Sequence, residues 1–557
     1  MPPWSHFTID FQTVRMPALC LAGLLWLLLA ALSAFPRPAA AQGDAPEAPR
    51  FDVLEYVVEG NTVLEVTEIE QAVTPFLGPG RSLDDVEQAR AALEKAYQSA
   101  GWLSVVVDIP EQRVDAGEVR LRVLEGRVER LSVTGARYVD QGMIRRRVPE
   151  LAAGKVPNFE RVQAQLAAAS RDDRRLQPVL RPGSAPGTVD AELKVEDRAP
   201  WSGSVELHND HADDTDPWRL HASVRYANLW QRDHALSLTA ITAPREPSQS
   251  QVLVASYGWP MDDGWSGSAY AVWSDSVVEP VGATVFGQGF TLGLRAQYAF
   301  AYGGGYHSIS LGADFKDLKE RLQFGDDSLS TPLRYLPLQV AWTGTWPEAR
   351  RLTTLNAQWT MAFRGLLSRD VECPGDVGPV DQFACKRQGG DGGFNHLRLD
   401  LRHQRPAPWD GWGRWSLRLQ AQLASQPLVS AEQFAVGGAD TVRGYLQAEA
   451  SGDRGLQGSA EWEGPSLLSA PGGDVDGAAG WLRALSLVGF VDVARIWVEA
   501  PSVGQQPRRS LIGAGVGLRL RAAAGLSAEA DLAWPGKAAV ATEAGDPRLH
   551  LRMQAQF

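Results

Sequence analysis

The sequence predicts a transmembrane antiparallel β-barrel of about sixteen strands, preceded by two small α+β domains. Three observations predict this fold class. The N-terminus carries an export signal, segments beyond Pro200 alternate apolar and polar residues with a period of two, and the last such segment ends on an aromatic residue, Phe557. A chain of 557 residues is also too long for one ordinary domain, so two or more domains are expected.

Residues 1–41 form the predicted signal peptide. An apolar stretch runs from Pro17 to Phe35, and Ala39 and Ala41 follow it as small residues that fit an A-x-A cleavage rule. A signal anchor is the alternative, but the stretch is only marginally long enough to span a bilayer. Later in the sequence there is no apolar run of about 18 residues. We therefore expect the mature chain to meet a membrane through strands.

Residues 51–127 and 128–199 repeat one order of elements: strand, helix, helix, strand, strand. In the first copy, a helix is expected from Thr67, with Glu70 completing a capping box, and a second helix is expected from Ser82 to Gly101. The second copy follows this plan more loosely. A sheet edge in such a domain can add an extended client as a further strand, although a generic spacer would have the same pattern.

Residues 200–557 lack helical periodicity and contain the predicted barrel. A soluble sandwich would show the same alternation of residues. Aromatic residues at the ends of the apolar faces, the export signal and the terminal aromatic strand favour the barrel. Strands are expected to start near residues 201, 218, 234, 251, 265, 290, 307, 335, 352, 394, 413, 455, 482, 510, 526 and 547.

The most distinctive stretch lies in a predicted long loop, residues 425–454. It carries a glycine pair, Gly437-Gly438, and then the run Thr441-Val442-Arg443-Gly444-Tyr445. Further along, Asp492 shares strand parity with Phe490, opposite apolar neighbours, which directs its carboxylate toward the barrel lumen. An arginine can hold a carboxylate through two parallel hydrogen bonds. A solvated arginine and an unrelated structural aspartate are the alternative.

These residues together resemble the transporters of two-partner secretion (TpsB type), the haemolysin and filamentous-haemagglutinin secretion-activation family. Gly60-Asn61-Thr62 and Leu124-Glu125-Gly126 resemble landmarks of POTRA domains, and the run Thr441–Tyr445 resembles the VRGF/Y motif of the sixth extracellular loop. The resemblance implies that this loop folds into the lumen, where Arg443 pairs with Asp492 of an F-x-D-x-G motif. Here Ala494 replaces the motif glycine, which leaves the close backbone approach at that position in question. Phe557 is implied as a barrel-assembly signal.

The resemblance implies an outer-membrane pore, with POTRA domains in the periplasm, that recognises and translocates a large unfolded exoprotein of adhesin or haemolysin type. Its implied partners are an exoprotein with an N-terminal secretion domain, outer-membrane lipids and, during biogenesis, the barrel-assembly machinery. A barrel insertase of the same superfamily is the alternative, but insertases usually carry more POTRA domains. Many relatives place a plug helix first, whereas residues 42–50 are too short for one, so we expect an unplugged pore.

The cysteines, the enzyme motifs and the net charge indicate which further chemical functions to expect of this chain. Cys373 and Cys385 form an even pair once Cys20 is removed with the signal peptide, which favours a loop disulfide over two free thiols. The sequence contains no H-E-x-x-H, G-x-S-x-G, P-loop or C-x-x-C motif, and its nine histidines show no ligand spacing. We therefore expect no enzymatic activity, no metal and no cofactor. A net charge of −12 without a basic stretch makes nucleic acid an unexpected partner.

Overall fold

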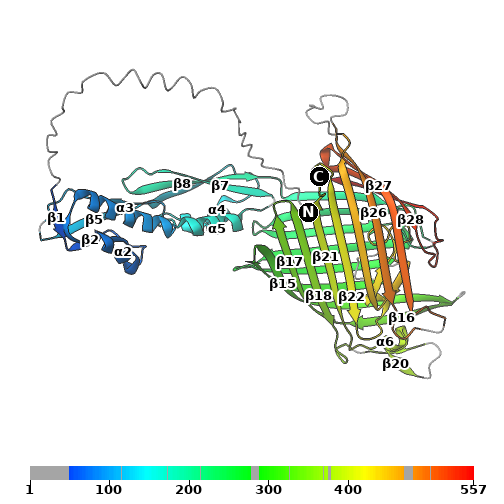
Figure 1. Cartoon of the computed structure of the whole chain (residues 1–557). Coiled ribbons are helices and arrows are strands. Elements are labelled where there is room, and N and C mark those ends of the chain that lie inside the picture. Colours follow the sequence, from blue (N-terminus) through cyan, green and yellow to red (C-terminus); the bar gives the residue numbers. More distant parts are fainter. Residues whose placement is uncertain are drawn as a thin grey trace, which may run out of the picture. The chain divides into compact units, whose positions relative to one another are not determined.

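The computed structural model describes residues 49–557 apart from Asp115, Asp172, Asp214, 277–287, 325–326, Ser368, 374–377, Asp410, 469–480 and 502–503. The predicted signal peptide and nearly all of segment 42–50 lie outside the described residues. The chain divides into two compact units between Arg198 and Ala199 (Figure 1). Among the described residues, no helix has the length and apolar character needed to cross a membrane.

The first unit contains two copies of one α+β arrangement. In each copy the last strand of the sheet in chain order is central. It pairs in parallel with the first strand and antiparallel with the second, and two helices pack on this sheet. The first copy consists of β2 (Glu55–Glu59), α2 (Val66–Val73), α3 (Leu83–Ser99), β4 (Val105–Asp108) and β5 (Glu118–Glu125). The second consists of β6 (Arg127–Thr134), α4 (Gln141–Arg147), α5 (Phe159–Ala169), β7 (Arg174–Pro182) and β8 (Thr188–Asp197). A short pair of β1 (Phe51–Val53) and β3 (Gly78–Arg81) adds to the first copy.

The landmark residues of the first copy are structural. Gly60 has φ +91°, and a Cβ there would lie 2.5 Å from the Val123 carbonyl oxygen, so no larger residue fits this turn. Asn61 Oδ1 accepts hydrogen bonds from the Leu64 N–H at 3.0 Å and from the buried Tyr97 hydroxyl at 2.8 Å. Burial raises the pKa of the Tyr97 phenol. The turn therefore fixes the path of the chain into α2.

The capping box predicted at Thr67 is wrong, although the helix begins within one residue of the predicted start. The N-cap of α2 is Glu65, which makes no capping bond, so Thr67 lies inside the first turn, where its backbone is helical and cannot cap. Asn61 Oδ1 accepts hydrogen bonds from the Val63 and Leu64 N–H groups in the turn just before this helix. At α3 the capping box is present, because Ser82 Oγ accepts the Asp85 N–H and Asp85 accepts the Ser82 N–H.

The second copy contains a turn held by one carboxylate. Glu129 accepts hydrogen bonds from the Ser184 N–H and the Thr188 hydroxyl, both at 2.8 Å. Hydrogen bonds from the Ser184 and Thr188 hydroxyls lower the pKa of Glu129 to about 2. A Cβ at Gly183 would lie 2.1 Å from the Thr188 hydroxyl oxygen, so the glycine makes this contact possible.

The second unit is a closed antiparallel β-barrel (Figure 1). Across the described residues, β16 and β17 both pair with β15 and share one position, so the wall has sixteen strands. The wall strands are β9 (Trp201–His208), β10 (Arg219–Leu229), β11 (His234–Thr242), β12 (Ser250–Pro260), β13 (Trp265–Ser276), β14 (Gln288–Tyr302), β15 (Gly305–Phe324), β16 (Asp327–Tyr335), β17 (Leu338–Glu348), β18 (Arg351–Met361), β21 (Asn395–Pro406), β22 (Arg414–Ala424), β25 (Arg454–Ser466), β26 (Leu482–Trp497), β27 (Arg508–Ala522), β28 (Leu526–Pro535) and β29 (Arg548–Gln556).

The predicted strand starts agree closely with the wall strands, and the fold class is confirmed. The eighth start, predicted near residue 335, differs most: β16 ends at Tyr335 and β17 begins at Leu338. Pro337 lies in this break, and proline has no N–H to give to a ladder. As a result, β16 pairs with the C-terminal part of β15, from Lys316 to Phe324. β17 pairs with its N-terminal part, from Tyr306 to Ala313.

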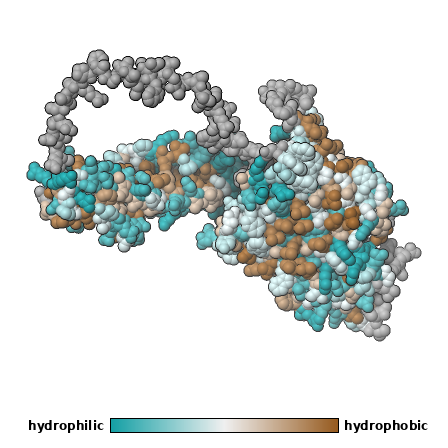
Figure 2. Space-filling model, in the orientation of Figure 1, coloured by the Kyte–Doolittle hydropathy of each residue, from teal (hydrophilic) through white to brown (hydrophobic). Residues whose placement is uncertain are grey.

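The outer surface of the barrel carries the apolar residues of the alternation. Hydrophobic residues gather over the wall strands in Figure 2. On β26, for example, Val491 and Val493 are 50% and 45% exposed, whereas the alternating residues Phe490 and Asp492 are buried. Exposed aromatic residues accompany this band, as an interface with lipid requires. They include Tyr226, Trp273, Trp359, Trp415 and Trp534.

The ring of strands closes between β29 and β9. The backbone of Phe557 exchanges two hydrogen bonds with Gly203, at 2.8 and 3.0 Å. The Phe557 ring lies edge-on to Trp201, with ring centroids 6.0 Å apart, and a Cβ at Gly203 would lie 2.7 Å from this ring. The terminal aromatic residue thus lies on the seam that closes the barrel.

Candidate functional site in the barrel lumen

The long loop between β22 and β25 folds into the barrel. Residues 425–453 contain a short hairpin, β23 (Phe434–Val436) and β24 (Ala450–Gly452), after a turn at Ser430–Glu432. Most side chains from Leu428 to Asp453 are buried or half-buried. Because β22 and β25 pair directly in the wall, burial of the intervening loop means that it lies against the inner face. We refer to residues 425–453 as the motif loop.

Arg443 of the motif loop binds Asp492 of β26. Nε lies 2.8 Å from Oδ2, one terminal guanidinium nitrogen lies 3.0 Å from Oδ1, and the Arg443 backbone N–H donates to Oδ2 at 3.1 Å. Both residues are buried, with 5% and 1% of their surfaces exposed. The structure thus brings the two sequence-predicted residues together as a fork-shaped pair, the geometry that lysine cannot reproduce.

Further groups complete the surroundings of the Arg443 guanidinium. Its other terminal nitrogen contacts Glu461 at 2.7 Å and Asp531 at 3.1 Å. The guanidinium carbon lies 3.4 Å from the centre of the Phe490 ring, a cation–π contact. Arg519 bonds to Asp531 at 2.9 Å, so a second cation offsets the three carboxylates around Arg443. A cavity of about 250 Å³ lies beside this cluster.

The rest of the motif also contacts the wall. The Tyr445 hydroxyl donates to the carbonyl oxygen of Lys537 at 2.8 Å, and the Gly444 N–H donates to His550 Nε2 at 3.0 Å. Val442 and Tyr445 are completely buried. Gly444 has φ +98°, which favours glycine. Each of these residues therefore fixes the tip of the loop through a different contact.

The preceding glycine pair shapes the bend before the motif. Gly437 has φ +117°, and a Cβ there would lie 2.4 Å from the Leu446 carbonyl oxygen. The Thr441 hydroxyl accepts from the Gly437 N–H at 2.8 Å and donates to the Gly437 carbonyl at 2.9 Å. A Cβ at Gly438 would lie 2.8 Å from the Asp210 carboxylate. The pair therefore lets the loop fold tightly on itself and against the first wall hairpin.

The close backbone approach that Ala494 left in question is made by another residue. Gly513 of β27 pairs with Asp492 in the wall, and a Cβ at Gly513 would lie 2.0 Å from the Arg443 carbonyl oxygen. Ala494 is buried in an apolar cluster with Val442 and Tyr445. Its methyl group packs on the loop and does not obstruct the pair.

Sequence reasoning missed two further anchors of the motif loop. Glu432 receives hydrogen bonds from the Lys316 ammonium and the Tyr335 hydroxyl, both at 2.7 Å, and lies 3.0 Å from His396 Nε2. Asp453 accepts from the Leu428 N–H at 2.7 Å and from Arg387 at 2.7 Å. The alternation of apolar and polar residues predicts that the polar wall residues face the lumen. It does not predict which of them the motif loop contacts, because that depends on how the loop folds.

The segment between β18 and β21 covers the base of the motif loop. Cys373 and Cys385 form a disulfide there, with Cα atoms 5.6 Å apart. The disulfide joins the end of β19 (Asp370–Glu372) to α6 (Gln382–Lys386). Phe383 of α6 belongs to the buried cluster that contains Leu428 and Val429. The cysteine pair therefore lies next to the point where the loop enters the lumen.

The chain resembles known protein families, curated sequences and solved structures. The family model described as haemolysin secretion/activation protein ShlB/FhaC/HecB matches residues 187–520, and that of the ShlB-type POTRA domain matches residues 51–126. Outer membrane transporter CdiB of Escherichia coli is 25% identical over 471 residues, which cover 79% of this chain and 73% of the relative. CdiB of Dickeya dadantii (strain 3937) is 22% identical over 188 residues, covering 34% and 33%.

Solved structures show the same fold. CdiB from Escherichia coli superposes with a TM-score of 0.62 at 20% identity, covering 94% of this chain and 93% of that one. CdiB from Acinetobacter baumannii gives 0.55 at 15% identity, covering 96% of each chain. BamA from Haemophilus ducreyi lacking POTRA domains 1–3 gives 0.50 at 13% identity, covering 91% and 100%.

Proposed function

The chain belongs to the haemolysin secretion/activation protein family ShlB/FhaC/HecB, and from this premise we propose that its barrel passes one large unfolded exoprotein to the cell surface. It is an outer-membrane transporter of two-partner secretion, with POTRA domains in the periplasm. The family match is the observation that carries this proposal. The likeness to BamA concerns the fold and does not favour an insertase. The family is one of transporters, and we assign no catalytic role to any residue.

The motif loop is the proposed gate of this pore. Its tip is held to the inner wall by Arg443, Gly444 and Tyr445, and its base is held by Glu432 and Asp453. Anchors at both places favour one fixed path of the loop beside the route of the client. The expectation of an unplugged pore concerns residues 42–48, outside the described part of the chain.

The periplasmic sheets are the proposed receptors for the client. In each copy the first two strands in chain order, β2 and β4 or β6 and β7, lie at the edges of the three-stranded sheet. Backbone groups at such an edge can bind an extended segment as an added strand. Export of the chain through a cleaved signal peptide, residues 1–41, would deliver these sheets to the periplasm.

A capture experiment tests this function. The complete transporter, purified from outer membranes after crosslinking, is expected to carry one large β-rich exoprotein, identified by mass spectrometry. Deleting the transporter should then leave that exoprotein in the periplasm. Capture of many different outer-membrane barrel precursors instead would favour the insertase.

Phe557 is the proposed assembly signal, recognised by the barrel-assembly machinery. Phe557→Ala is expected to lower the amount of assembled barrel several-fold, because the seam loses the ring contact with Trp201. Heat-modifiable mobility in gels measures the assembled fraction. Met553→Ala, at another exposed outward position of β29, is the matched control and should assemble normally. Equal assembly of the Phe557 variant and the control would contradict the role.

A further inference from the structure

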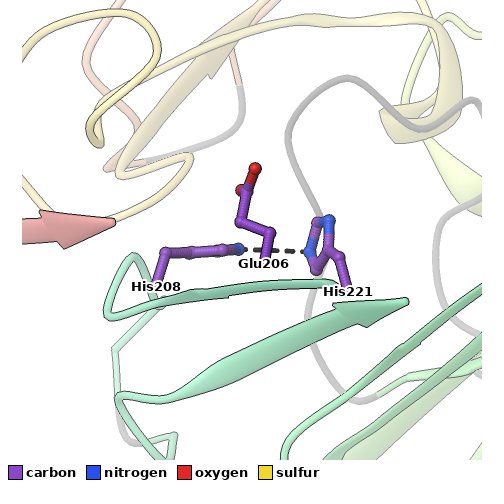
Figure 3. Close-up of side chains that lie close together, drawn as sticks. All are labelled: Glu206, His208 and His221. Carbon is purple, nitrogen blue, oxygen red and sulfur yellow. Dashed lines mark hydrogen bonds between the residues drawn. The ribbon is translucent and has the colours of Figure 1, made fainter. Parts of the chain in front are cut away.

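Three residues with metal-binding side chains project into the lumen from the first wall hairpin. Glu206 and His208 lie two positions apart on β9 and therefore share its inner face. His221 of β10 pairs directly with Glu206 in the antiparallel register, which places it on the same face. Figure 3 shows the His208 and His221 rings facing each other, with the Glu206 side chain rising between them. Their arrangement is thus set by a hydrogen-bonded ladder and not by a loop.

The ligand atoms of this group lie close together. One atom each from Glu206, His208 and His221 falls within 4.8 Å of the others. The two Nε2 atoms are 3.1 Å apart. Two imidazole nitrogens bound to one tetrahedral ion, each at about 2.0–2.1 Å, would be separated by about 3.3 Å. The separation of the two nitrogens therefore nearly matches that of a shared ion. To bind it, each ring must turn so that its Nε2 lone pair faces the ion instead of the other ring, and the Glu206 carboxylate must move closer.

The Asp210 N–H lies 3.2 Å from Nδ1 of His208. This contact favours the proton of neutral His208 on Nε2, where it is shared with His221. A metal at Nε2 takes the place of that proton, and the tautomer with the proton on Nδ1 must form. Ion binding thus costs one long backbone hydrogen bond, at the upper end of the usual distance range.

The neighbouring charges leave the group open to an ion. Arg219, opposite His208, directs its guanidinium to backbone oxygens of Asp216 and Trp218. Arg552 lies 3.3 Å from one oxygen of Glu206 and donates to Asp440 of the motif loop at 2.8 Å. Asp440 and His208 line the same cavity beside Arg443. Glu206 and Asp440 carry two negative charges, and Arg552 offsets only one of them. The remaining negative charge favours the binding of an added cation.

We propose that Glu206, His208 and His221 bind a divalent transition-metal ion of the zinc type, through two imidazole nitrogens and one carboxylate oxygen. Two histidines and one carboxylate suit zinc and leave a fourth position for water. Hard cations such as Mg²⁺ and Ca²⁺ prefer oxygen ligands, so the two imidazoles favour zinc over them. The ion would lie on the wall that faces Asp440, next to the proposed gate.

Zinc titration of the full-length protein tests the site. The chain is purified in detergent without a polyhistidine tag, treated with a chelator and titrated with Zn²⁺ by calorimetry, with Co²⁺ absorption as a second readout. We expect one ion per chain. Glu206→Gln should weaken zinc binding at least about tenfold, and the His208→Ala, His221→Ala double variant at least about a hundredfold, since even outer-shell changes cost 10–100-fold.

His403→Ala is the matched control. His403 lies on β21, bonds to the Thr353 hydroxyl at 2.8 Å and is outside the cluster, so its loss should leave zinc affinity unchanged. Heat-modifiable mobility shows that each variant contains an assembled barrel. The proposal is overturned if the wild-type protein binds no zinc, or if assembled Glu206→Gln and double-histidine variants bind it as tightly as the wild type.

Discussion

Replacing Arg443 with alanine is expected to reduce secretion of the exoprotein at least about tenfold while the barrel still assembles. The change removes the fork to Asp492, the contacts to Glu461 and Asp531 and the stack on Phe490. Breaking a buried ion pair on one side costs about 3–5 kcal/mol, since the remaining carboxylates keep their charge without a partner. The tip of the motif loop would then leave its one docked position and adopt many conformations inside the lumen.

Secretion and loop docking can be measured on the same cells. The amount of exoprotein in the medium reports transport. Tyr445 is completely buried in the docked loop, so chymotrypsin added to intact cells should cleave there only in variants that release the tip. Arg443→Lys should lie between wild type and Arg443→Ala, because one ammonium cannot replace the fork and the stack together.

Asp492→Ala should reproduce the loss, and the double variant should be less impaired than the sum of the two single changes. Arg402→Ala is the matched control: Arg402 pairs with Asp400 at 3.0 Å and its side chain is 49% exposed. An exposed pair of this kind contributes about 0–1 kcal/mol, so secretion should remain normal. Normal secretion by both Arg443→Ala and Asp492→Ala would remove the pair from the transport mechanism.

The barrel could be predicted closely because lipid and lumen impose opposite demands on neighbouring residues of every strand. This rule holds from β9 to β29, and the predicted start that differs most lies at the break around Pro337, where β16 ends and β17 begins. Local capping rules were less secure. They held at Ser82, where the capping box forms within four residues, and failed at Thr67, which lies inside the first turn. The turn before that helix is held by a contact distant in sequence, between Asn61 and Tyr97.

The Arg443–Asp492 pair could be anticipated because one residue has a distinctive motif and the other has lumen parity. Glu461 and Asp531 could not, since their approach to Arg443 depends on the register of β25 and β28 relative to β26. The same reason hid the three candidate metal ligands. Glu206 and His208 are spaced by two in the sequence, but His221 joins them only through the pairing of β9 with β10. The nine histidines were judged by their spacing along the chain, and that spacing does not predict which residues strand pairing brings together.

Gly513→Ala is expected to impair secretion several-fold, whereas Ala494→Gly should leave it near normal. The added Cβ at Gly513 would lie 2.0 Å from the Arg443 carbonyl oxygen, too close for any backbone contact, so the tip must move away from Asp492. Ala494→Gly loses a buried methyl group and costs about 1 kcal/mol of stability, but it opens no path for the loop to leave. This ordering is unexpected from the sequence motif alone, which sets the glycine at position 494.

Chymotrypsin cleavage at Tyr445 separates the two outcomes. It should increase in Gly513→Ala and stay at the wild-type level in Ala494→Gly, with both barrels assembled. Gly489 of β26 is the control position, because a Cβ added there would meet no atom within 4 Å, and Gly489→Ala should secrete normally. If Gly513→Ala secretes as well as Gly489→Ala, close contact between β27 and the motif loop is not needed for transport. The docked tip would then tolerate a shift of the backbone, and the side-chain fork of Arg443 alone would hold it.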